Sequence, residues 1–215
     1  MTTIVETLEQ LSLEYRGHTP KKDGIELRGS EKEHHNGYKT RRGIDSYELN
    51  LNFNLLGWLS SVLYARSIDK QDESFVVLDL GCGSGRFLSE VESLHSSIVG
   101  YGITLELFED DYSRDKIITA SYNDSSLHPY VMPDIPDDSI DFVVSNFSFC
   151  HSSDSGFVPL LFHVHRILKP GCIAVLDVGG CYMDRTIELS IGDDIPIDVH
   201  YKDTNNNVYG ITIIK

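Results

Sequence analysis

The chain has 215 residues, a formal net charge of −15 at pH 7, 40% hydrophobic residues and 24% charged residues. These values are ordinary for a globular protein and leave room for one domain with a modest appendage. No stretch approaches the ~18 consecutive apolar residues of a membrane span. The acidic balance disfavours a nucleic-acid partner, because phosphates are bound by clustered Lys and Arg.

The first residues and the cysteines indicate a reducing, intracellular setting. The start "MTTIVETLEQ" lacks the basic region and apolar run of a secretory signal, so a cytoplasmic location is expected. The four cysteines form no CxxC pair and no close cluster, which is typical of reduced, buried thiols. We therefore propose no metal site.

The amino-terminal part is predicted to contain two helices separated by a long loop. The first helix is expected to begin at Thr3, because Thr3-Ile4-Val5-Glu6 has the spacing of a capping box and apolar residues follow at helical spacing. Residues 17–43 are polar, contain five glycines and show no periodicity, which predicts a loop.

A second helix is predicted over residues 46–66, with Asp45 or Ser46 as its cap. Its apolar face is expected to hold Leu49, Phe53, Leu56 and Leu63.

Strand and helix patterns alternate after residue 74. Strands are predicted over residues 75–78, 98–103, 116–120, 141–145 and 172–178, and helices over 87–94, 105–112 and 157–168, the last ended by Lys169-Pro170-Gly171. Such alternation predicts an α/β fold with a mostly parallel sheet and helices on both faces. Residues 195–201 and 208–214, joined by a polar turn, predict two final strands that pair antiparallel.

Three closely spaced glycines follow the first of these strands, in "VVLDLGCGSGRFL" (residues 76–88). Glycine permits positive φ and allows a ligand to approach the main chain, so Gly81, Gly83 and Gly85 predict a small-molecule site at this strand end. The dinucleotide fingerprint GxGxxG fails by one position, because Arg86 stands where its third glycine should be. This disfavours a nicotinamide-dependent oxidoreductase.

Three segments in order carry a family resemblance. "VVLDLGCGSGRFL" resembles the first motif of class I S-adenosylmethionine-dependent methyltransferases, with sequence like methyltransferase type 11. "MPDIPDDSIDFVVSNFSFCH" (132–151) and "HRILKPGCIAVLDV" (165–178) are similar to the family's fourth-strand and fifth-strand regions. The resemblance implies a Rossmann-like, mostly parallel seven-stranded sheet with an antiparallel C-terminal strand. It divides the chain into N-terminal helices and a lid segment (1–70) and an S-adenosylmethionine-binding domain (71–215).

The resemblance also implies roles for individual residues. Asp79 would face the amine of the cofactor S-adenosylmethionine, and the main chain of Gly81, Gly83 and Gly85 would lie along it. The usual ribose-binding acid is replaced by Gly102 or Thr104, depending on the alignment, and Glu106 is an alternative ribose ligand. The remaining candidates are Tyr122, Asn123 and Asp124 for adenine, Asn146 for the cofactor, and His151 as a general base or a structural residue.

The chemistry expected from this family is methyl transfer to a small molecule, with a protein side chain as a less favoured acceptor. Ser145-Asn146-Phe147-Ser148 departs from the Asn-Pro-Pro-Tyr signature, which disfavours amide and nucleobase nitrogen as acceptors. The missing ribose acid leaves an alternative open: a methyltransferase-like binding or scaffold protein without turnover. The sequence does not specify the oligomeric state.

Overall fold

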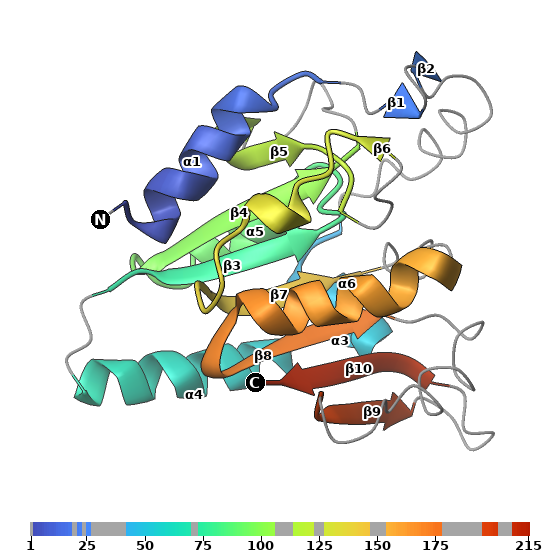
Figure 1. Ribbon diagram of the computed structural model, residues 1–215. Coiled ribbons are helices and arrows are strands. Elements are labelled where there is room, and N and C mark those ends of the chain that lie inside the picture. Colours follow the sequence, from blue (N-terminus) through green and yellow to red (C-terminus); the bar gives the residue numbers. More distant parts are fainter. Residues whose placement is uncertain are drawn as a thin grey trace.

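The computed structural model describes residues 2–18, 21–22, 25–26, 42–69, 73–105, 114–122, 127–146, 154–177, 195–201 and 208–215. Helices lie on both faces of a central twisted sheet (Figure 1). The helices are α1 (Ile4–Glu14), α3 (Ile44–Leu51), α4 (Leu55–Ile68), α5 (Arg86–Glu92) and α6 (Asp154–Ile167), with short 3-10 turns η1 (Arg114–Lys116) and η2 (Met132–Asp134). The strands are β1 (Lys21–Lys22), β2 (Ile25–Glu26), β3 (Phe75–Leu80), β4 (Ile98–Thr104), β5 (Ile117–Thr119), β6 (Leu127–His128), β7 (Ile140–Ser145), β8 (Leu168–Asp177), β9 (Ile197–Tyr201) and β10 (Val208–Ile214).

The main sheet has seven strands in the order β5-β4-β3-β7-β8-β10-β9. Neighbouring strands from β5 to β8 pair parallel, whereas β10 pairs antiparallel with both β8 and β9. The predicted α/β class, the mostly parallel sheet and the antiparallel C-terminal strand are therefore confirmed. Because β4 and β7 flank β3 on opposite sides, the chain reverses its direction of travel across the sheet at β3, and ligands collect at such a point.

Two apolar cores lie on the two faces of the sheet. One core joins α1, η2 and α6 to the sheet, and the other joins α3, α4 and α5 to its opposite face (Figure 1). Strand β3 contributes to both, since Val76 and Leu78 point to the first core while Phe75 and Val77 point to the second. All six residues of β3 are buried, as expected of a strand covered on both sides.

Helix α1 begins as its sequence predicts. The Thr3 side chain accepts a hydrogen bond from the Glu6 main-chain N–H, and the Glu6 carboxylate accepts one from the Thr3 N–H at 2.7 Å. This reciprocal pair satisfies two main-chain donors that a helix start otherwise leaves unpaired. Leu8 and Leu11 are buried against the sheet.

The single helix predicted over residues 46–66 is wrong. The segment forms two helices, because Asn52 adopts a left-handed conformation (φ 49°) and Asn54 caps α4 by accepting from the Gly57 N–H. The cap of α3 is Gly43 rather than Asp45 or Ser46. Because the helix is broken here, α3 turns a different side toward the core than a single continuous helix would. Leu49, which is expected in the core, is therefore 67% exposed.

Three further differences concern segment boundaries. The predicted loop over 17–43 contains the short strands β1 and β2, which pair with each other, and β1 also pairs with β6 to form a small separate sheet. Lys169-Pro170-Gly171 does not end helix α6 but belongs to β8, which begins directly after Ile167. Most of the helix predicted over 105–112 falls outside the described residues. None of the helices in the described part of the chain is long and apolar enough to cross a bilayer.

Candidate cofactor site

The glycine turn after β3 has the geometry that its sequence predicts. Gly81, Gly83 and Gly85 have φ angles of 82°, 55° and 72°, a region that residues with a Cβ rarely occupy. The N–H groups of Gly81 and Cys82 donate to the Ile103 carbonyl at 2.8 and 3.1 Å, which fixes the turn to the end of β4. The turn then leads directly into helix α5, with Gly85 as the N-cap.

Asp79 lies at the end of β3, beside this turn, and is fully buried. Its Oδ2 accepts a hydrogen bond of 2.7 Å from the Tyr47 hydroxyl, whereas its Oδ1 has no partner among the described residues. Burial raises the pKa of the Asp79 carboxyl from 3.8 to about 7, although the Tyr47 hydrogen bond and the Arg42 charge both lower it. A buried carboxylate oxygen without a donor is costly, so a donor or cation from a ligand is expected there.

Other buried polar atoms near these strand ends also lack partners within the described residues. Both amide atoms of Asn146, which is 2% exposed and directly follows β7, are unpaired, as are Ser84 Oγ in the glycine turn and Thr119 Oγ1 at the end of β5. Native proteins keep few such groups. Their concentration at one edge of the sheet marks this edge as a site for a polar ligand.

The structure brings several of the predicted site residues to this edge. Thr104 and Thr119 are register partners at the ends of β4 and β5, and Thr104 is buried with 8% exposure. Tyr122 follows β5 and is 3% exposed. Glu106, Asn123, Asp124 and His151 lie outside the described residues.

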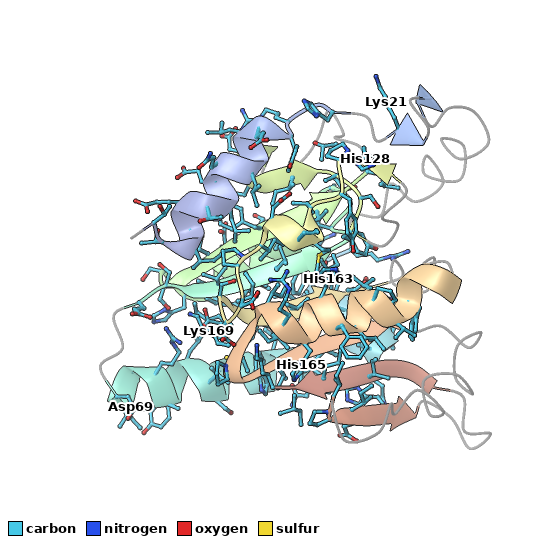
Figure 2. The ribbon with its side chains drawn as sticks, viewed as in Figure 1. Lys21, Asp69, His128, His163, His165 and Lys169 are labelled. Atoms are coloured by element: carbon cyan, nitrogen blue, oxygen red, sulfur yellow. The ribbon has the colours of Figure 1, made fainter. Side chains whose placement is uncertain are left out.

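Two histidines that could suggest a second site do not converge. His163 and His165 lie on different sides of α6 (Figure 2). His163 packs edge-on against Tyr130, and burial lowers the pKa of both imidazoles. Across the described ranges, no group of three or more His, Cys, Asp or Glu side chains could hold a metal ion.

Two residues that the sequence interpretation missed complete the wall of the site. Tyr47, on α3, is 2% exposed and stacks on Phe87 of α5 with ring centroids 4.0 Å apart. Arg42, just before α3, donates from Nη1 to the main-chain oxygen of Asn146 at 3.0 Å. A sequence signal did exist for Tyr47, because Ile44, Tyr47 and Leu51 form a buried stripe at helical spacing, but the assumed continuous helix placed Leu49 on that face.

The structure gives a steric reason why position 102 holds glycine instead of the usual ribose-binding acid. A Cβ added at Gly102 would lie 2.6 Å from Cys82 Cβ and closer still to its sulfur, so no side chain fits there as the turn stands. We expect Gly102→Ala to destabilise the fold by about 1–3 kcal/mol through overpacking. Thermal unfolding should show the loss, and Gly102→Ala combined with Cys82→Gly, which removes both the Cβ and the sulfur of Cys82, should recover part of it. An equal loss in the double variant would contradict the clash.

The middle of the chain also matches a known family. Residues 78–176 match the family model described as a methyltransferase domain. This match, which spans just under half of the chain, supports a class I S-adenosylmethionine-dependent methyltransferase. The glycine turn, Asp79 and Asn146 all fall within the matched methyltransferase segment, whereas Tyr47 and Arg42 precede it.

Individual relatives agree with this family. Malonyl-[acyl-carrier protein] O-methyltransferase of Yersinia pestis is 28% identical over 106 residues, which are 49% of this chain and 37% of that protein. The chain thus spans little more than a third of the length of this curated relative. A TehB-like S-adenosylmethionine-dependent methyltransferase of Corynebacterium glutamicum has the same fold, with a TM-score of 0.52, 16% identity, and coverage of 86% of this chain and 99% of that one. A chain from the complex of the Haloferax volcanii Trm112 methyltransferase activator and its putative methyltransferase has a TM-score of 0.51, 15% identity, and coverage of 87% and 98%.

The residues of the site fit the family's cofactor. S-adenosylmethionine carries an ammonium group, and Asp79 Oδ1 offers an unpaired carboxylate oxygen for such a cation. The glycine turn offers main chain without side chains, against which a nucleoside can lie. When bound, S-adenosylmethionine supplies an activated methyl group on a sulfonium, so the protein mainly has to bind and orient the reactants.

Proposed function

We propose that this protein is an S-adenosylmethionine-dependent methyltransferase that acts on a small-molecule acceptor. The observation that carries the proposal is the unpaired, buried Oδ1 of Asp79 beside three glycines with positive φ. A scaffold protein would gain nothing from a buried carboxylate held in this way, because its desolvation reduces stability. Binding of a cationic ligand offsets that cost.

Individual roles follow from position. Asp79 binds the ammonium group, and the turn from Gly81 to Gly85 packs along the cofactor. Thr104 lies at the strand end where the ribose is expected, and the unpaired Thr119 hydroxyl lies beside it in register. Tyr122 contributes to the adenine pocket. Together with Asn123, Asp124 and Glu106, these residues form our proposed adenosyl site.

The acceptor side is proposed to begin at Asn146, whose amide can both donate to and accept from a polar acceptor or the cofactor. His151 is proposed as a base on the acceptor, and residues 1–70 as the cover of the pocket. A methyl acceptor bearing an oxygen is supported by the Yersinia pestis relative, which is an O-methyltransferase. The burial of Asn146 favours a small molecule over a folded protein surface.

Titration calorimetry with S-adenosylhomocysteine, the demethylated product of the cofactor, tests the cofactor part of the proposal. We expect a dissociation constant in the micromolar range, about −8 kcal/mol of binding free energy. NAD should not shift the melting temperature. Silence at millimolar S-adenosylhomocysteine would contradict the proposal.

Turnover requires its own test. Labelled S-adenosylmethionine incubated with fractions of small metabolites and, separately, of proteins should give labelled product in a small-molecule fraction. Asp79→Asn is the matched control, since it removes the cation-binding charge without changing the side-chain volume. Label confined to protein would overturn the acceptor class while leaving methyl transfer intact.

A further inference from the structure

Helix α3 lies outside the segment that matches the methyltransferase family, yet it reaches the centre of the site. The Tyr47 hydroxyl on α3 donates to Asp79 Oδ2 at 2.7 Å, and both side chains are almost completely buried. The two oxygens of Asp79 therefore have different partners. One is held by Tyr47, and the other is unpaired within the described residues.

The position of Tyr47 is fixed by contacts on both sides. Its ring stacks on Phe87 of α5, with an interplanar angle of 11°. Glu90 of α5 accepts a hydrogen bond of 2.7 Å from the Ile44 N–H at the start of α3, and Arg86 donates to the other oxygen of Glu90 at 2.6 Å. Helix α3 is thus attached to the helix that follows the glycine turn.

The main chain at the start of α3 also lies close to the Glu90 side chain of α5. A Cβ added at Gly43 would lie 2.5 Å from Glu90 Oε1, so a side chain at this position would displace the carboxylate that accepts from Ile44. Arg86 directly follows Gly85, the last residue of the turn. The glycine turn, α5, α3 and Asp79 therefore form one connected unit in which Tyr47 has little freedom to move.

We infer that Tyr47 is a positioning residue for Asp79: its hydroxyl holds one carboxylate oxygen, stabilises the ionised form, and leaves the other oxygen facing the ammonium group of the ligand. This inference rests on the proposed function. It adds a residue outside the matched family segment to the machinery that binds the cofactor.

The electrostatic surroundings of Asp79 make the effect measurable as a change in pH dependence. Burial raises the pKa of Asp79 to about 7, Tyr47 and Arg42 lower it, and Asp177 at the end of β8 raises it. The pKa of the Tyr47 hydroxyl is itself raised, chiefly by burial and then by Asp79, with a smaller coulombic contribution from Cys82 in the glycine turn. Removing the Tyr47 hydroxyl should move the pKa of Asp79 upward, so that less carboxylate is available near neutrality.

Calorimetric titration of Tyr47→Phe with S-adenosylhomocysteine from pH 6.5 to 8.5 tests the inference. We expect binding roughly tenfold weaker than wild type at pH 6.5 and within about twofold at pH 8.5, where the carboxyl is ionised in both proteins. Tyr101→Phe is the matched control, because Tyr101 is also 2% exposed and its hydroxyl donates to the Val5 carbonyl, at 3.3 Å, on the other face of the sheet. Its pH profile should match wild type.

A double-mutant cycle separates positioning from general packing. In the Asp79→Asn background, Tyr47→Phe should cause no further loss of affinity, because the group through which it acts is gone. Parallel pH profiles for wild type and Tyr47→Phe, or an additive loss in the cycle, would overturn the inference while leaving the proposed function intact. Failure of the wild-type protein to bind S-adenosylhomocysteine would overturn the proposed function itself.

Discussion

Asp79→Asn is expected to weaken S-adenosylhomocysteine binding by at least about 30-fold and, at the same time, to make the protein more stable at neutral pH. The loss of affinity follows from removal of a charge-assisted hydrogen bond in a buried site, worth about 2–3 kcal/mol. The amide keeps the shape of the carboxyl, and its oxygen can still accept from Tyr47. Weaker ligand binding together with higher stability indicates that the original residue serves ligand binding rather than the fold.

The gain in stability has a definite pH window. The pKa of Asp79 is raised from 3.8 to about 7 on folding, chiefly by burial, so the folded protein holds this proton more tightly than the unfolded chain. Wild-type stability therefore falls as the pH rises from about 4 to about 7, by up to about 4 kcal/mol. Asp79→Asn should have little effect at pH 4 and its full stabilising effect at pH 8.

Chemical denaturation at pH 4, 6 and 8 without ligand, paired with calorimetry, measures both effects. Ser139→Ala is a suitable control, because Ser139 is buried just before β7 and its hydroxyl donates to the Pro136 carbonyl at 2.6 Å. A destabilised Asp79→Asn protein at pH 8 would show that Asp79 has a structural partner and would remove the main support for the cofactor site.

Asp141→Asn is expected to do the reverse: to destabilise the protein by about 2–4 kcal/mol while leaving cofactor affinity unchanged. Asp141 lies near the start of β7, and its side chain is 1% exposed. It accepts from Arg66 at 3.2 Å, from Lys169 at 2.9 Å and from the Val76 N–H at 2.8 Å. A neutral amide leaves two partly buried cations without their counter-charge, which costs more than the net value of an intact pair.

The ion pairs of Asp141 with Arg66 and Lys169 lie far from the candidate cofactor site. Asp141 precedes Asn146 by five residues of strand, roughly 16 Å. Calorimetry well below the melting temperature should therefore give a dissociation constant for S-adenosylhomocysteine within about twofold of wild type. Lys169→Met, which removes one cation and keeps the aliphatic stem, should cost less than Asp141→Asn. A large change in affinity for Asp141→Asn would mean that the two ends of the sheet are coupled.

Much of the fold was predictable because its elements carry strong local signals. The buried strands, the capping box at Thr3 and the glycine turn all depend on residues adjacent in sequence, and all were correct. Asp79 and Asn146 were identified as candidates through the family resemblance. In the structure both residues are buried and carry side-chain atoms that have no hydrogen-bond partner among the described residues, as expected of residues that bind a polar ligand. Their roles, the division at residue 70, the cytoplasmic location and the absence of a nucleic-acid partner stay predictions.

The failure that affected the candidate site most has a local physical cause. The break at Asn52 depends on one residue in a left-handed conformation, which asparagine tolerates but does not require. Because of this break, Tyr47 rather than Leu49 faces the core. A prediction that assumes one continuous helix therefore cannot foresee the contact between Tyr47 and Asp79. A hydrogen bond between residues 32 positions apart has no signature in a single sequence.

Helix α3 rests not only on α5 but also on the far end of the chain. The Leu51 carbonyl accepts from His200 Nδ1 at 3.2 Å, while Thr212 donates to the other ring nitrogen at 2.7 Å. Strand β10, which carries Thr212, lies between β8 and β9, so His200 of β9 is held for its contact with α3 only when β9 and β10 have paired. Contacts so distant in sequence slow folding, because closing the intervening loop costs entropy before the contact forms. We therefore expect the refolding chain to acquire its secondary structure before its capacity to hold a nucleoside, with a measurable lag between the two.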